Sequence, residues 1–166
     1  AIHEAVAGIK HKKLELAEDI VIYHTGYSSG LQRQKMERNL RILRHEAEKA
    51  GYEDPQDYHY FMDCFYGLQD YAQAIAYAEK ILSHPQLPER DRLNAYEIQA
   101  SSYINGNYPE STVRAVLEKS AAARPEQVRL QAMQGLYLFE CRDYLAAMPI
   151  LRQSLQQEKQ DSRQRH

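Results

Sequence analysis

Three segments of this chain share one pattern and follow one another at nearly equal spacing. They cover residues 58–82, 93–120 and 130–155. Each contains a helix-length run, a short polar turn and a second helix-length run. A tyrosine closes every turn, and the three are Tyr71, Tyr108 and Tyr144. Self-similarity at a period of roughly 20–50 residues is typical of stacked repeat architectures.

Apolar side chains within these runs follow helical spacing. In the first run Tyr58, Phe61, Met62 and Phe65 lie at i, i+3, i+4 and i+7, as on one face of an α-helix. A helix pair of this size cannot bury its apolar face alone, so consecutive pairs are expected to stack into one core. The pattern predicts an all-α fold with about three helix pairs over residues 52–160.

An additional amphipathic helix is predicted over residues 31–51, ahead of the repeats. Met36, Leu40, Leu43 and Ala47 form its apolar stripe, and we expect this stripe to cap the first repeat. The opposite side is rich in arginine. We interpret it as a solvated face, with a binding patch as the alternative.

The two ends of the chain do not follow the helical pattern. Residues 14–16 and 20–23 look like short strands, and two short strands without a sheet are marginal in water. We therefore expect residues 1–30 to be the edge of a preceding domain, including a linker. Residues 161–166 are polar and are expected to form a disordered tail.

Charge and composition argue against several functions. The formal net charge is −2, which gives no electrostatic basis for nucleic-acid binding. No apolar run approaches the roughly 20 residues that cross a bilayer, so membrane insertion is not expected. Cys64 and Cys141 fit no metal-binding spacing. We interpret them as buried free thiols of a cytoplasmic protein, with a disulfide as the alternative.

The repeats resemble tetratricopeptide (TPR) repeats. In the first unit, the residues that match this family are Phe65, the pair Asp70-Tyr71 and Ala74. In the third unit, Gly135 stands where the family has a small packing residue. Ser111 departs from the pattern, because alanine is usual there. The resemblance implies an α-hairpin solenoid whose first helices line a concave groove for a protein or peptide, including a second copy of this chain. Carried over by position, the groove candidates are Gln56, His59, Asp63, Tyr66, Asn94, Glu97, Arg129 and Ala132.

Motifs ahead of the repeats resemble a second family when their order is considered. His3-Glu4 is followed by His24-Thr25-Gly26-Tyr27 and then by Arg38-Asn39-Leu40. This order is similar to the C-terminal part of bacterial family 2 glycosyltransferases that carry TPR repeats. The resemblance implies that a GT-A catalytic domain precedes this chain in the intact protein.

The same resemblance implies chemistry that lies mainly outside this chain. The parent enzyme would use a nucleotide-sugar donor and a divalent metal, Mg²⁺ or Mn²⁺, and His3 would be a metal-site candidate only in that parent. The chain itself has no Asp-x-Asp motif and no glycine-rich phosphate loop, so no catalytic residue is predicted in it. The expected role is to orient an acceptor or to mediate self-association. The alternative is a stand-alone TPR adaptor that binds a peptide in the groove.

Overall fold

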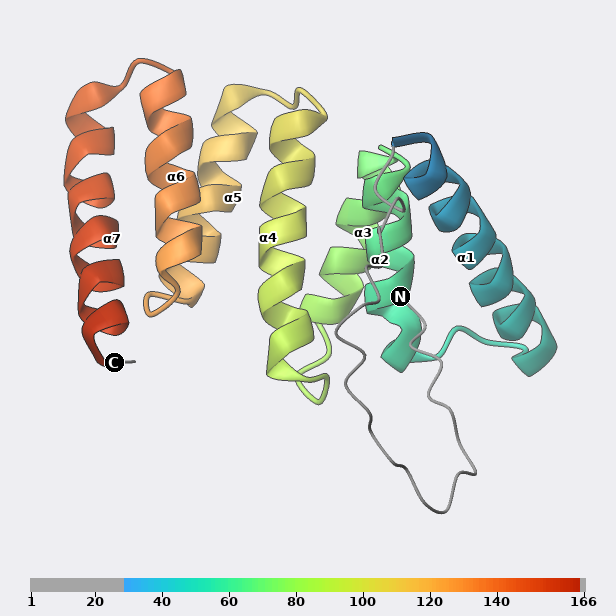
Figure 1. Cartoon of the computed structure of the whole chain (residues 1–166). Helices are drawn as coiled ribbons and strands as arrows, with labels where there is room; N and C mark the ends of the chain where they lie inside the picture. The colour runs from blue at the N-terminus through green and yellow to red at the C-terminus, as the bar shows by residue number, and fades with distance from the viewer. Residues whose placement is uncertain (1–28, 165–166) are drawn as a thin grey trace, which may run out of the picture.

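The computed structural model describes residues 29–164, with the backbone alone at 29–30 and from 161 to 164 (Figure 1). All regular elements in this part of the chain are helical, which confirms the predicted all-α class. The predicted strand-like runs lie outside the described residues. The helices are α1 (Ser29–Ala50), the 3-10 helix η1 (Pro55–Asp57), α2 (Tyr58–Gly67), α3 (Tyr71–Leu82), α4 (Glu89–Asn105), α5 (Glu110–Ala123), α6 (Val128–Glu140) and α7 (Tyr144–Gln164).

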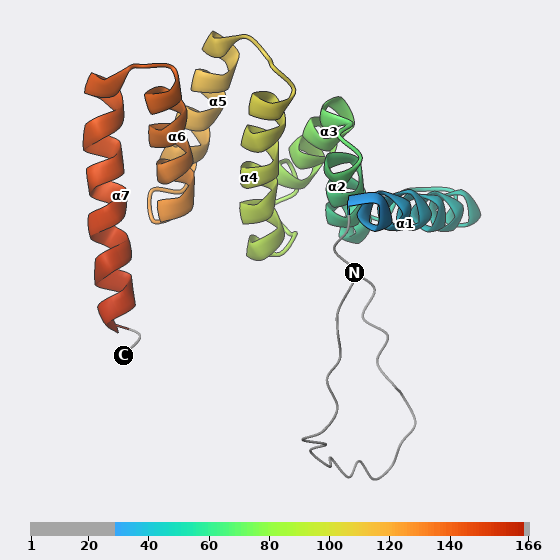
Figure 2. The same cartoon turned by 45° about the horizontal axis from the view of Figure 1, so that its top comes forward.

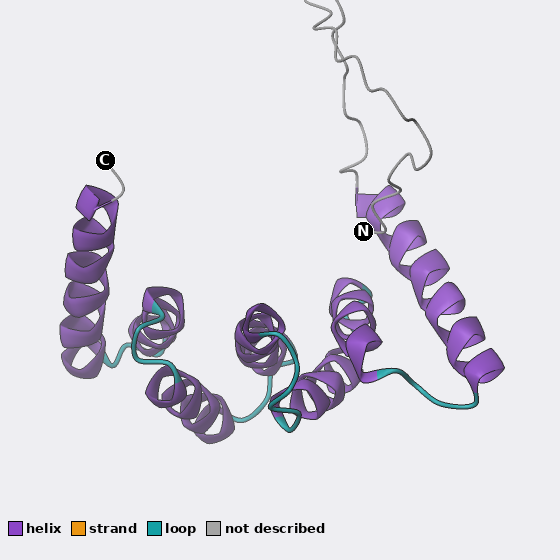
Figure 3. Ribbon diagram, turned by 90° about the horizontal axis from the view of Figure 1, so that it is seen from below, coloured by secondary structure: helices purple, strands orange, loops and turns teal. Residues whose placement is uncertain are grey.

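The helices lie across the molecule in chain order, with α1 at one end and α7 at the other (Figures 1 and 2). They form three consecutive units: η1 with α2 and α3, then α4 with α5, then α6 with α7. Each helix contacts the next, and α2 also contacts α4 across the first unit boundary. Viewed from below, α2, α4 and α6 follow one row, while α3 and α5 follow a second row beside it (Figure 3).

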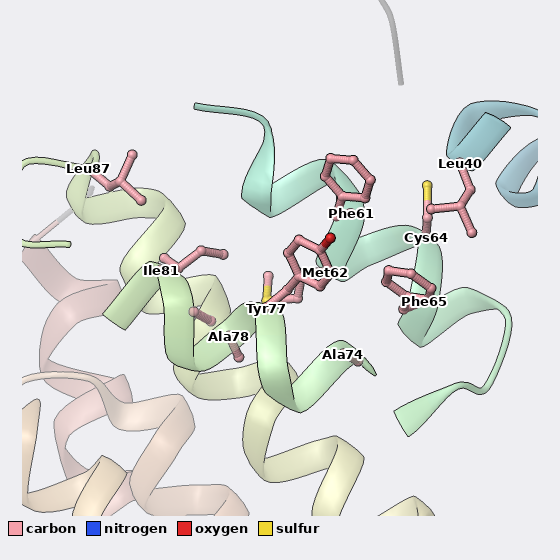
Figure 4. Close-up of a cluster of buried hydrophobic side chains, with 11 residues drawn as sticks. Leu40, Phe61, Met62, Cys64, Phe65, Ala74, Tyr77, Ala78, Ile81 and Leu87 are labelled. Carbon is pink, nitrogen blue, oxygen red and sulfur yellow. The ribbon is translucent and has the colours of Figure 1, made fainter. Parts of the chain in front are cut away.

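Two hydrophobic clusters stabilise the array. The larger one joins α1, the first unit and the start of α4, and the close-up shows Phe61, Met62 and Tyr77 at its centre (Figure 4). The smaller one contains Ala100 of α4 with Val113 and Leu117 of α5. Because α4 contributes to both clusters, it connects the first half of the array to the second.

The three units turn between their helices with the same backbone geometry. Gln69, Asn107 and Arg142 each adopt a left-handed conformation, with φ of 63°, 54° and 63°. The next residue donates its N–H to a carbonyl five positions earlier, as in a Schellman motif. These bonds are Asp70 N to Phe65 O (2.9 Å), Tyr108 N to Tyr103 O (3.2 Å) and Asp143 N to Leu138 O (2.9 Å).

An edge-to-face aromatic pair spans each of these turns, which gives the recurring tyrosines a structural role. Such pairs stabilise beyond the area that they bury. The position of the tyrosine relative to the second helix nevertheless differs between the units. Tyr71 and Tyr144 begin their helices, while Tyr108 precedes Pro109, the N-cap of α5. The pairs, with ring-centroid distances, are Tyr66–Tyr71 (5.9 Å), Tyr103–Tyr108 (4.8 Å) and Phe139–Tyr144 (5.1 Å).

The final helix differs from the sequence prediction at its C-terminal end. The helix α7 extends through residues 161–164, which the sequence prediction assigned to the tail, while 165–166 lie outside the described residues. The run QQEKQ that precedes the tail consists of good helix formers, and these favour continuation of the helix. At its start, α7 is capped by Asp143, which accepts a bond from Ala146 N at 3.3 Å. Similarly, residues 29–30 belong to α1 and not to the preceding segment.

Candidate binding surface

The predicted groove residues come from η1 and from the first helix of each unit. We define the α2–α4–α6 face as the surface formed by these residues: Gln56, His59, Asp63, Tyr66, Asn94, Glu97, Arg129 and Ala132. Apart from Gln56 of η1, they belong to α2, α4 and α6, the helices that form one row in Figure 3. The structure links several of them directly from one helix to the next.

The first link joins α2 to α4. Asn94 Nδ2 donates to Asp63 Oδ1 at 3.2 Å. Surrounding protein displaces water from the Asp63 carboxylate, and this raises its pKa above the ordinary value, although the amide bond from Asn94 and the nearby His59 imidazole act in the opposite direction. Asp63 still has an exposed edge, so its second oxygen can accept a hydrogen bond from a ligand.

The second link joins α4 to α6. Arg129 Nε lies 3.1 Å from Glu97 Oε2, and the arginine side chain is largely exposed while the glutamate is mostly covered. Exposed ion pairs add little stability, on the order of 0–1 kcal/mol. Because the Arg129 side chain is largely exposed, its remaining guanidinium donors stay available to a carbonyl or carboxylate of a bound partner.

Two residues that the sequence reasoning missed complete the row of contacts. His59 Nδ1 lies 4.0 Å from Asp91 Oδ2, and the hydroxyl of Tyr66 accepts a bond from Asn105 Nδ2 at 3.1 Å. Asp91 precedes Asn94 by three positions on α4, so helical spacing could have identified it. Asn105 is the last residue of α4, where the periodic pattern gives no such signal.

The α2–α4–α6 face offers hydrogen-bond donors and acceptors, but no catalytic set is evident on it. Cys64 of α2, which follows Asp63 in the sequence, is a buried free thiol. Burial, with a smaller contribution from Asp63, raises the pKa of that thiol to about 11. Because the thiolate is the reactive form, Cys64 is a poor nucleophile near neutral pH. Cys141 is also a free thiol, but it is partly exposed rather than buried as predicted.

Metal binding finds no support in the part of the chain that the structure describes. No group of three or more His, Cys, Asp or Glu side chains among residues 31–160 is arranged to hold an ion. His3, the metal-site candidate of the parent enzyme, lies outside the described residues. Likewise, no helix within this part of the chain combines the length and the apolar character needed to span a bilayer.

The basic face of α1 borders an open cavity of about 690 Å³ next to the α2–α3 turn. Part of its positive charge already serves packing, since the Arg44 guanidinium lies 5.9 Å from the centre of the Phe65 ring. Arg33 pairs with Glu37 at 3.1 Å. The residues lining the cavity are Gln34, Glu37, Arg38, Leu40, Arg41, Arg44 and Leu68.

Comparisons with protein-family models, with curated proteins and with solved structures found no match to this chain.

Proposed function

We propose that this chain is a non-catalytic, TPR-like interaction region of a bacterial family 2 glycosyltransferase, working in the cytoplasm. The parent enzyme would transfer a sugar from a nucleotide-sugar donor with the help of Mg²⁺ or Mn²⁺. The α2–α4–α6 face would hold a protein or peptide, either the acceptor or a second copy of the chain. An extended segment, rather than a helix, suits a row of polar donors and acceptors.

The observation that carries this proposal is the set of polar links between successive first helices. Asp63 with Asn94, and Glu97 with Arg129, place polar groups along α2, α4 and α6 in turn. The three matching turns support a solenoid of repeated hairpins, in which each unit contacts its neighbours. The His-Thr-Gly-Tyr motif and the Arg-Asn-Leu run ahead of the repeats favour the glycosyltransferase parent over a stand-alone adaptor.

Two inexpensive experiments test the relation to an enzyme. The coding region upstream of this chain should encode a GT-A domain, and a short adaptor reading frame without one would favour the alternative function. The isolated chain, incubated with Mn²⁺ and a panel of nucleotide sugars, should release no nucleotide diphosphate above the rate of spontaneous hydrolysis. Sustained release would show that the chain is itself catalytic.

A charge exchange across the second link tests whether the α2–α4–α6 face binds a partner. Acceptor proteins or peptides captured by the wild-type chain would be titrated against Glu97→Arg, Arg129→Glu and the double variant. The double variant restores an ion pair with reversed polarity, so its free energy of unfolding should return to within about 0.5 kcal/mol of wild type. Its affinity should stay about tenfold weaker, because the partner meets the wrong charge.

An exposed charge on α5, outside the α2–α4–α6 face, provides the control. Lys119 is exposed on α5, and Lys119→Glu should leave both affinity and stability unchanged. If the double charge exchange binds the partner as tightly as wild type, Glu97 and Arg129 only join the helices, and the proposed binding role fails.

A further inference from the structure

Corresponding positions in the first and third units lie 73 residues apart, as the capping residues Asp70 and Asp143 show. Adding 73 to a residue number of the first unit gives the equivalent position in the third unit. This relation identifies the side of the third unit that corresponds to the side of the first unit in contact with α4. Met148 corresponds to Ile75, and Phe139 corresponds to Tyr66. We call this side of α6 and α7 the outer face of the third unit, formed by Leu136, Phe139, Leu145, Met148, Arg152 and Leu155.

In the first unit, the corresponding side is in contact with α4. Ile75 is only 7% exposed and α3 contacts α4, although Ala72 and Glu79 on the same side are exposed. On α2, the carboxylate of Asp63 and the hydroxyl of Tyr66 accept bonds from Asn94 and Asn105 of α4. A helix therefore lies over this side of the first unit and is held by apolar and polar contacts.

The second unit is covered in a similar way. Ile104 of α4 and Met133 and Tyr137 of α6 all pack against the smaller cluster. On α5, Arg114 donates from Nη1 to Asp143 Oδ2 of the third unit at 2.9 Å. Both units thus use this side to receive the first helix, or the turn, of the unit that follows.

The outer face of the third unit is apolar but uncovered among the described residues. Met148 is 41% exposed, Phe139 is 49% exposed and Leu155 is 52% exposed. Leu145, in the first turn of α7, is 94% exposed. Neighbouring exposed apolar residues mark interaction sites more often than scattered ones do.

The charges on α7 indicate which kind of helix would complement this face. Arg152 lies between Met148 and Leu155 at helical spacing, and it stands where the first unit has Glu79. Glu79 is close enough to Tyr103 of α4 to contribute, after burial, to the raised pKa of that phenol. If a helix docks on the third unit in the way that α4 docks on the first, its residue at the position of Tyr103 lies near Arg152. An acidic residue at that position would pair with the arginine. Two copies of α7 paired through this stripe would instead bring their arginines together.

We propose that the outer face of the third unit is a docking site for an amphipathic α-helix of a second protein. That helix carries apolar residues at i, i+3 or i+4, and i+7, which contact Phe139, Met148 and Leu155. It also carries an acidic residue that pairs with Arg152. On α6 this site adjoins Arg129 and Ala132 of the α2–α4–α6 face, but it extends onto α7 and does not depend on the glycosyltransferase assignment.

Peptides based on α4 provide a defined probe, because α4 covers the equivalent side of the first unit. A fluorescein-labelled peptide of residues 88–106 and its Tyr103→Glu version would be titrated with the full chain and followed by fluorescence anisotropy. The Tyr103→Glu peptide should bind about three- to tenfold more tightly at low salt, and the difference should shrink at high salt because screening weakens exposed charge pairs.

Three protein variants locate the binding. Met148→Asp should weaken both peptides about tenfold or more, because it places a charge in an apolar contact. Arg152→Glu should reverse the preference between the two peptides. Tyr52→Asp is the control, because Tyr52 is an exposed aromatic residue at the far end of α1, and it should leave binding unchanged. Circular dichroism of each variant verifies that the helices remain folded.

Three results would overturn the proposal. One is the absence of saturable binding for either peptide, and another is unchanged binding by Met148→Asp. The third is a dimer in sedimentation equilibrium that Met148→Asp dissociates, because a second copy of the chain would then be the occupant of the face.

Discussion

At the residue scale, Glu53 ties the segment after α1 to the second helix of the first unit. Its carboxylate accepts bonds from Tyr77 Oη and Lys80 Nζ, both at 2.7 Å. The Lys80 ammonium also lies 4.1 Å from the centre of the Tyr77 ring, in the geometry of a cation–π contact. Burial raises the pKa of Glu53, but the bonds from Lys80 and Tyr77 outweigh it, so the pKa lies below its usual value of 4.5.

This depressed pKa predicts a pH-dependent stability. An ionised Glu53 stabilises the folded state above its unfolded pKa, and that contribution is lost as the pH falls through the lower folded value. Glu53→Gln should therefore cost about 1 kcal/mol at pH 7, at the low end for charged hydrogen bonds because the site is partly exposed. Urea unfolding should show the gap to wild type closing between about pH 5 and pH 3.

The control for this pH series is Glu46→Gln, on the exposed surface of α1. It should stay within about 0.5 kcal/mol of wild type at every pH. A gap for Glu53→Gln that persists unchanged to pH 3 would contradict a role for the Glu53 charge.

The left-handed residues at the unit turns provide a graded test of backbone strain. Arg142 has φ of 63°, a conformation that glycine adopts at no steric cost. Arg142→Gly should raise the free energy of unfolding by about 0.5–1 kcal/mol. Asn107→Gly should change it much less, since asparagine tolerates this region well. Urea denaturation would measure both, and equal effects would mean that conformational strain is not the cause.

At the element scale, Gly135 sets how closely α6 approaches α7. A Cβ added there would lie 2.7 Å from Leu151 Cδ2 and 2.8 Å from Leu151 Cγ. Gly135→Ala gains roughly 1 kcal/mol in helix propensity, but overpacking costs about 1–3 kcal/mol. We expect a net loss of about 1 kcal/mol in chemical denaturation.

The partner of Gly135 supplies the matching control. In the background Leu151→Ala, the clash is removed, so Gly135→Ala should become neutral or stabilising. A loss of equal size in both backgrounds would show that Leu151 does not limit the approach of the two helices.

At the scale of the whole molecule, the larger cluster decides whether the first unit folds. Phe65 is buried and its ring lies 5.5 Å from that of Tyr77. Phe65→Ala should cost about 3–5 kcal/mol, which is a large share of the stability of a small array. Amide hydrogen exchange should then show α2 and α3 losing protection before α6 and α7, because each unit depends mainly on its neighbours.

Phe139→Ala is the control for this experiment, since Phe139 is a half-exposed aromatic residue. It should cost about 1 kcal/mol or less. A loss below about 1 kcal/mol for Phe65→Ala would show that this ring does not stabilise the core.

The sequence predicted the helical class, because apolar periodicity is a local signal. It did not predict that Gln69 and Arg142 are left-handed, since neither residue type favours that conformation. Nor did it locate Glu53, whose partners Tyr77 and Lys80 are distant in sequence. Such contacts depend on how the helices pack, and apolar spacing within one helix carries little information about that.

The sharing of α4 between the two clusters has a mechanical consequence. Tension applied to the two ends of the array must pass through this helix, because Ala95 belongs to one cluster and Ala100 to the other. In an optical trap, the smaller cluster should yield first and the larger one at higher force. The molecule would then lengthen in two steps, with α4 as the junction between them.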